Sequence, residues 1–186
     1  ASEPAPTPDQ DALILDLWGI AAHSASPEFN DATEEQFEES AAWGGPAARV
    51  EAAEAAFDLV YQRPDLYHVI YPLAEPLLTD PHPAVRLNAA VRIGRIWDID
   101  REHFWQLIAQ VLENEQNLTV IEHVLGDVVS RLIHSEPART VMLLLALLHR
   151  EPAGSDRAHR LCKAIADKLT VLWVTYQSQE AKVVLD

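Results

Sequence analysis

The sequence predicts an all-α fold of stacked antiparallel helical hairpins, and three observations support this. Ala and Leu dominate over Val, Ile and Thr, a balance that favours helix over strand. Twelve prolines and only six glycines in 186 residues indicate many short, regular elements with sharp ends. Apolar residues recur at helical spacing in one segment after another, and no segment alternates as a strand would.

Turn signals separate the helical segments. Trp43-Gly44-Gly45-Pro46 is the clearest, because two glycines free the backbone to turn and proline is accepted in the first turn of a helix. Pro72 and Pro76 are expected to kink or split one helix, and Asp100 is expected to cap the next. The expected helices cover residues 10–23, 34–43, 47–61, 66–78, 84–97, 101–113, 118–133, 137–150 and about 156–176.

The first third of the chain differs from the rest. Residues 1–9 include three prolines and are expected to form a disordered tail. Residues 10–62 are expected to form an acidic helical part, in which Leu13, Leu17 and Ile20 make the packing face of the first helix. Asp9 is available as the cap of that helix.

A repeated rhythm runs through residues 64–180. Helices that follow the connectors begin near Val85, Val120 and residues 157–158, which gives a period of about 35 to 38 residues. A period in this range is typical of helical hairpins that hide their apolar faces only against their neighbours. The sequence therefore predicts a repeat array over 64–180.

Residues 80–90, Asp80-Pro81-His82-Pro83-Ala84-Val85-Arg86-Leu87-Asn88-Ala89-Ala90, resemble the HEAT repeat family. Its typical unit has a leucine-rich first helix, an Asp/Pro turn, and then Val-Arg and an alanine in the second helix. The resemblance implies a right-handed α-solenoid and a structural role for Arg86, because the Arg of this motif commonly reaches the Asp of a neighbouring turn. Asp80 is expected to accept backbone N–H groups at the turn. The units near residues 114–125 and 151–161 keep less of the pattern.

Composition excludes several function classes. The net charge is −15, and residues 1–60 hold 13 acids against one base, so nucleic acid is not expected as a partner. Cys162 is the only cysteine, which rules out an internal disulfide, favours a cytoplasmic location and is itself expected to be buried. The longest apolar run, residues 141–148, is too short to cross a bilayer.

Two surfaces are candidates for binding another protein or peptide. The first is the polar side of the second helices, which would line one concave wall and suit acidic or phosphorylated segments; ordinary solvated helix faces are the alternative. The second is an acidic N-terminal surface that would engage a basic protein or mimic nucleic acid. Separately, Trp43 lies beside two glycines and is a candidate exposed anchor. The first set is Asn88, Arg92, Arg95, His123, Asp127, Arg131, Arg160 and Lys163; the second is Glu34, Glu35, Glu38 and Glu39.

Two enzyme classes are alternatives to a protein-binding role. Glu102-His103 and Glu122-His123 are similar to the His-Glu pairs of helical-repeat di-iron hydroxylases, but their order is reversed and that family has four pairs. HEAT-like DNA glycosylases line a groove with Trp, Asp and Arg, yet no family motif matches here. The residues that could take those roles are Trp97, Arg92, Arg95, Asp127 and Arg131. The sequence therefore predicts a non-enzymatic interaction or scaffold module with no metal and no cofactor.

Overall fold

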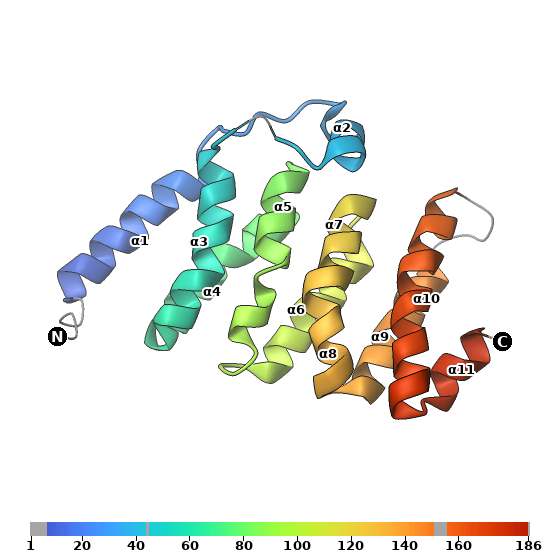
Figure 1. Ribbon diagram of the computed structural model, residues 1–186. Helices are drawn as coiled ribbons and strands as arrows, with labels where there is room; N and C mark the ends of the chain where they lie inside the picture. Colours follow the sequence, from blue (N-terminus) through green and yellow to red (C-terminus); the bar gives the residue numbers. More distant parts are fainter. Residues whose placement is uncertain (1–6, 44, 151–155, 186) are drawn as a thin grey trace. The chain divides into compact units, whose positions relative to one another are not determined.

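The computed structural model describes residues 7–43, 45–150 and 156–185. It divides into two compact units, Ala1–Ile99 and Asp100–Asp186, and each is described by itself. Helix is the only regular structure in the described ranges (Figure 1), which confirms the all-α prediction. None of these helices is both long enough and apolar enough to cross a bilayer. The expected tail lies outside the described residues up to residue 6, whereas Pro8 and Asp9 already belong to the first helix.

The first unit has two helices of 15 residues and several shorter elements. Its core is formed by fully buried side chains such as Phe57, Ile70, Val85 and Ile93. The most extensive contacts between elements of this unit join α3 to α1 and to α5. The elements are α1 (Pro8–Ala22), α2 (Thr33–Ser40), α3 (Ala48–Gln62), η1 (Pro64–Leu66), α4 (Tyr67–Ala74), η2 (Glu75–Thr79), α5 (Pro83–Ala90) and η3 (Ile93–Ile96).

The packing of α1 corrects the prediction from spacing. Leu13, Leu17 and Ile20 were expected to be buried, but they are 58%, 58% and 72% exposed. The helix is instead held through its opposite side by Trp18, which is buried and whose Nε1 donates to the Ala52 carbonyl at 2.8 Å. The cap is Thr7, not Asp9: its side chain accepts from the Gln10 N–H in a capping box.

Proline divides the next segment as expected. The α-helical hydrogen bonding of α4 gives way to a 3₁₀ turn at η2, which contains Pro76. The apolar residues Val69 and Leu73 of α4 are about half exposed and not buried. The helix expected over 84–97 is also interrupted, because α5 ends at Ala90 and a separate 3₁₀ turn, η3, follows.

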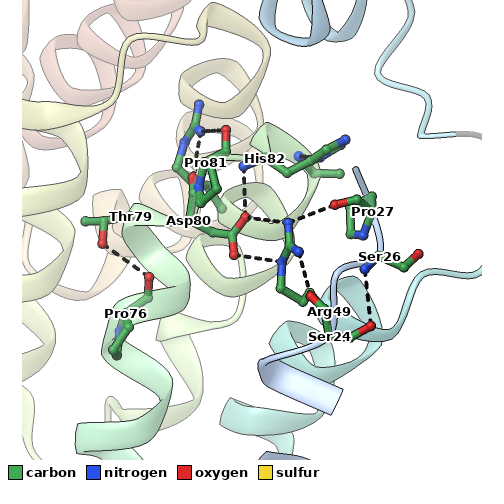
Figure 2. Close-up of polar contacts among 11 residues, drawn as sticks. Ser24, Ser26, Pro27, Arg49, Pro76, Thr79, Asp80, Pro81 and His82 are labelled. Atoms are coloured by element: carbon green, nitrogen blue, oxygen red, sulfur yellow. Dashed lines mark hydrogen bonds and ion pairs between the residues drawn. The ribbon is translucent and has the colours of Figure 1, made fainter. Parts of the chain in front are cut away.

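A cluster around Arg49 joins three segments of this unit (Figure 2). Arg49 on α3 donates from Nε to Asp80 Oδ2 at 3.0 Å, and from its terminal nitrogens to the carbonyls of Ser24 and Pro27 at 2.6 and 2.9 Å. Asp80 also accepts the backbone N–H of His82 at 2.8 Å, as expected for a turn residue. Both charged side chains are mostly buried, at 13% and 9% exposure, so their hydrogen bonds are well shielded from water.

Arg86 is structural, but its partners differ from those that the HEAT resemblance implies. It donates to the backbone carbonyls of Asp80 and Pro81 at 2.9 and 3.0 Å, and to the Glu34 carboxylate on α2 at 2.8 Å. The Asp80 carboxylate is bound by Arg49 of the preceding long helix. Arg86 therefore fastens the start of α5 to its own turn and to α2.

The second unit contains helices close to the predicted ranges, and one more. The prediction missed α11 and the π-helical turn η4. The turn contains Gly126, and glycine favours a regular α-helix less than other residues do. Asp100 caps α6 as expected, accepting the His103 N–H at 3.0 Å. The elements are α6 (Arg101–Asn114), α7 (Leu118–Val124), η4 (Leu125–Val129), α8 (Ser130–Ser135), α9 (Pro137–Arg150), α10 (Asp156–Tyr176) and α11 (Gln179–Leu185).

Cys162 on α10 corrects a second expectation. Its neighbour Leu161 and the apolar stripe that continues at Ile165 are buried, but the thiol is exposed. On a helix adjacent residues point about 100° apart, and this difference places Cys162 outside the stripe.

We predict that Arg49→Ala lowers the free energy of unfolding by about 2–3 kcal/mol, because it leaves the buried Asp80 carboxylate without its guanidinium partner. Arg49→Lys should recover less than half of the loss, since an ammonium group cannot reproduce the planar fork. Urea unfolding followed by tryptophan fluorescence measures both. Arg101→Ala is the control, because Arg101 is 53% exposed and 3.7 Å from Glu136; a loss as large as that of Arg49→Ala would contradict the argument.

His82 makes the stability depend on pH. Burial is the main cause that lowers the pKa of His82 below 6.5, and its Nδ1 accepts the Ala84 N–H at 3.1 Å only when unprotonated. As pH falls below the unfolded pKa of about 6.5, the unfolded chain binds the proton first, so stability falls by up to about 1.4 kcal/mol per pH unit.

We therefore expect His82→Asn, which keeps a capping acceptor, to lose less stability than the parent between pH 7.5 and 5.5. Urea midpoints measured across this range check it. The carboxyl groups with lowered pKa, such as Asp11 and Glu102, titrate below this window. Equal slopes for the two proteins would show that His82 is not the group responsible.

Candidate interaction surface

The candidate residues of the first unit are already engaged by its own carboxylates. Arg92 pairs with Glu54 on α3 and lies 3.8 Å from Asp58, while Arg95 donates to Asp58 at 2.8 Å. Asn88 is buried, donates to the Ala84 carbonyl at 2.9 Å and accepts from Arg92 at 3.2 Å. Arg92 and Arg95 therefore fasten η3 and the turn before it to α3, and Asn88 supports Arg92. Helices α3 and α5 lie side by side in Figure 1.

In the second unit the candidates are more accessible. His123, Asp127 and Arg131 are exposed along α7, η4 and α8, and their spacing of four residues places them on one face. The His123 ring bonds the Thr119 carbonyl at 2.8 Å through Nδ1. Lys163 is exposed on α10, the helix that packs against α7 and α8.

Arg160 differs from the other candidates of this unit. It donates to both oxygens of Glu122 on α7, at 3.3 and 2.9 Å. Further along the same two helices, His134 Nδ1 and the Tyr176 hydroxyl are 2.8 Å apart. Because Glu122 precedes His134 and Arg160 precedes Tyr176, the two contacts show that α7–α8 and α10 run in the same direction.

The arginine pairs share one spacing in the sequence. Arg92 and Glu54 are 38 residues apart, as are Arg160 and Glu122, while Arg95–Asp58 and Arg139–Glu102 are separated by 37. Each pair joins two helical segments that are 37–38 residues apart in the sequence. This recurrence agrees with the period of about 35 to 38 residues estimated from the connectors.

Two of these pairs also share an aromatic residue three positions after the acid. Arg95 lies 5.0 Å from the centre of the Tyr61 ring while it binds Asp58, and Arg139 lies 4.7 Å from the Trp105 ring while it binds Glu102. Acid and aromatic face the same side of a helix at this spacing, so together they hold the guanidinium by charge and by cation–π attraction. Sequence reasoning missed these partners; the recurrence of acid and arginine at 37–38 residues was the available signal.

The alternative acidic surface is only partly free. Glu34 binds Arg86 at 2.8 Å, Glu38 is half-buried and also has a partner, and Glu35 and Glu39 are exposed on α2. Trp43 is 37% exposed.

The residues considered as catalytic candidates also make structural contacts. Glu102 binds Arg139 through both oxygens, at 2.8 and 3.0 Å, and this contact lowers the pKa of Glu102. Glu122 binds Arg160. In the described ranges no group of three or more His, Cys, Asp or Glu side chains is placed to hold a metal ion. Of the residues considered for glycosylase chemistry, Trp97, Arg92 and Arg95 belong to the first unit, and the others to the second.

A groove that the sequence did not indicate lies between α6 and α9. Its volume is about 390 Å³, and its walls are mainly apolar, with Leu112, Leu143 and Leu147 among the lining residues. Arg150 also lines the groove and donates to the carbonyls of Leu112 and Glu113 at 2.6 and 3.1 Å. Because these carbonyls lie in the last turn of α6, Arg150 serves as its cap.

Comparisons of the chain with protein-family models, with curated proteins and with solved structures gave no match.

We predict that Arg92→Ala lowers the free energy of unfolding by about 1–2 kcal/mol, because it removes hydrogen bonds to a charged partner across a part-buried contact between α3 and the turn that follows α5. Arg131→Ala, at an exposed position on α8, should change stability by less than about 0.5 kcal/mol. Urea unfolding of the two variants makes the comparison. A larger loss for Arg131→Ala would show that Arg131, and not Arg92, has the structural role.

Proposed function

We propose that this chain is a non-enzymatic, cytoplasmic protein-binding module, in which HEAT-like hairpins stack as a right-handed α-solenoid and hold another protein or peptide. The observation that carries the proposal is the spacing of 37–38 residues between paired helices in each unit. Contact between successive repeats is the defining property of solenoids, and stacked repeats present extended surfaces suited to binding.

The surface that best fits this role lies in the second unit. His123, Asp127 and Arg131 follow one face of α7–α8 over eight residues, or about 12 Å. Arg131 and Lys163 are exposed cations there. A partner segment with carboxylate or phosphate groups would bind the guanidinium of Arg131 through two hydrogen bonds.

The arginines of the first unit are weaker candidates for binding. A ligand carboxylate would have to displace Glu54 and Asp58, which already occupy Arg92 and Arg95. Displacement costs the hydrogen bonds that it replaces, so the net gain in affinity would be small. The proposed binding surface is therefore narrower than the set that the sequence suggested, and it centres on Arg131.

A second candidate function uses the acidic side of α2. Glu35 and Glu39 are exposed and four residues apart, so they face the same side of the helix. The neighbouring Arg86–Glu34 pair anchors α2 to α5, which would present these two carboxylates on a fixed helix. A basic protein is the partner that this surface would suit.

Affinity capture with the 186-residue chain as bait, read by mass spectrometry, tests the proposal. We expect Arg131→Glu to lose a partner that the parent chain retains, because it places a repulsive charge in the cationic part of the surface. Arg101→Glu is the matched control, with the same change in charge at an exposed arginine on α6, and it should retain the partner.

The variant Glu35→Lys/Glu39→Lys separates the two candidate surfaces. If this variant loses the partner and Arg131→Glu retains it, the acidic surface is the binding site and the Arg131 surface is rejected. Loss in both Arg131→Glu and Arg101→Glu would instead indicate a general effect of charge. Circular dichroism of each variant checks that the helices are retained.

A further inference from the structure

The groove between α6 and α9 results from two small side chains, one on each helix. Ala109 and Ala146 both line it, and they are as far apart in the sequence as Glu102 and Arg139, 37 positions, which join the same two helices. The alanines therefore lie at the same level of the two helices. Because their side chains end at Cβ, they leave a volume of about 390 Å³, which is within the range of about 300 to 1,000 Å³ typical of small-molecule sites.

Contacts on both sides of the groove hold the two helices in place. Near their starts, Arg139 donates to both oxygens of Glu102. In their last turns, Arg150 donates to the carbonyls of Leu112 and Glu113 at 2.6 and 3.1 Å. Since the helices are joined start to start and end to end, they run in the same direction. The groove between these contacts is therefore formed before any ligand arrives, as is usual for binding sites.

The polar groups of the groove that are not already engaged are hydrogen-bond acceptors. Nδ1 of His149 lies 2.6 Å from the Leu145 carbonyl, so Nδ1 carries the proton and Nε2 of the neutral ring is an acceptor. Glu113 and His149 are both exposed. Within the described chain, neither the Glu113 carboxylate nor Nε2 of His149 has a hydrogen-bond partner. The groove therefore suits a ligand that offers donors.

The charge beside these acceptors is negative. Because α6 and α9 run in the same direction, their C-terminal ends lie together, and each end carries about half a negative charge. Of the lining side chains, Glu113 adds one negative charge and Arg150 one positive charge, so the balance is about one negative charge. His149 adds none while its ring is neutral. A monovalent cation with several N–H donors complements this end of the groove.

We infer that the groove between α6 and α9 binds a small apolar amine. The apolar body lies against Ala109, Ala146 and the lining leucines, and the ammonium group donates to the Glu113 carboxylate and to Nε2 of His149. A carboxylate in the same place would face Glu113 and the carbonyl ends of two helices. The site shares no lining residue with the Arg131 surface, so it does not depend on the function proposed for that surface.

Three probes with the same six-carbon chain and different head groups test the inference. Hexylamine, hexanol and hexanoate are titrated separately at pH 7.5 into the ¹⁵N-labelled 186-residue chain, and amide shifts are followed by NMR. We expect hexylamine to bind with a dissociation constant of about one millimolar and to shift amide signals of α6 and α9. Hexanol and hexanoate should each bind at least about fivefold more weakly, because neither matches the charge of the site.

Substitutions in the groove separate its apolar and polar parts. Ala146→Leu fills the hollow and should weaken hexylamine binding by at least about tenfold, and Ala109→Leu repeats this test from the other helix. Glu113→Gln keeps the shape but removes the charge, so it should abolish the preference for hexylamine over hexanol. Asp167→Asn is the matched control, with the same change in charge at an exposed position on α10, and it should bind like the parent. Circular dichroism confirms that each variant is folded.

Four results would overturn the inference. The first is a parent chain that shows no hexylamine binding in the millimolar range. The second is hexanoate that binds as tightly as hexylamine, which would make Arg150 the partner of the head group. The third is unchanged hexylamine binding in both Ala146→Leu and Ala109→Leu. The fourth is a loss of preference in Asp167→Asn as large as in Glu113→Gln, which would indicate the net charge of the chain and not the groove.

Discussion

The pairing of an arginine with a carboxylate 37–38 residues earlier is the interaction on which the arrangement of helices within each unit depends. Apolar burial drives helices together but does not fix how far one slides along another. Arg92 with Glu54 and Arg160 with Glu122 join segments that run in the same direction, so each pair sets the axial position of one segment against a helix about 38 residues earlier. The Arg49–Asp80 pair does the same for the turn before α5, with additional bonds to two backbone carbonyls. The Arg49 and Asp80 side chains are only 13% and 9% exposed, so this pair is held more strongly than a surface ion pair would be.

The helices could be predicted from the sequence because nearby capping residues and prolines determine where they begin and end. Asp100 caps α6 and Pro137 begins α9, as the sequence indicates. The packing of α1 could not be predicted in this way, since Leu13 and Leu17 form a convincing apolar face. The deciding contacts are the hydrogen bond from Trp18 to Ala52 and the bridge from Arg63 to Asp11, which join residues 34 and 52 positions apart. The apolar periodicity of a single helix does not reveal contacts with distant segments of the chain.

The sequence predicted which helix positions the candidate residues occupy, but not which of their charges are free to bind a ligand. The polar residues of the second helices were identified by their place on the helix, but the acids that neutralise them lie on other helices. Arg95 was therefore expected to be available to a ligand, whereas Asp58 and Tyr61 already hold it. Arg131 and Lys163 remain exposed. In this chain, a charged side chain should therefore be compared with the residue 37–38 positions earlier before it is assigned to a ligand.

Arg150 has a consequence for the order in which the second unit forms. It belongs to the last turn of α9, yet its donors are bound to the Leu112 and Glu113 carbonyls at the end of α6. A helix whose final carbonyls are satisfied by a later segment frays until that segment has folded. The C-terminal turn of α6 is therefore completed only after α9 has docked. The stability of the end of α6 thus depends on the later helix. During synthesis, the first hairpin of this unit would wait for the second before its amide protons became fully protected from exchange.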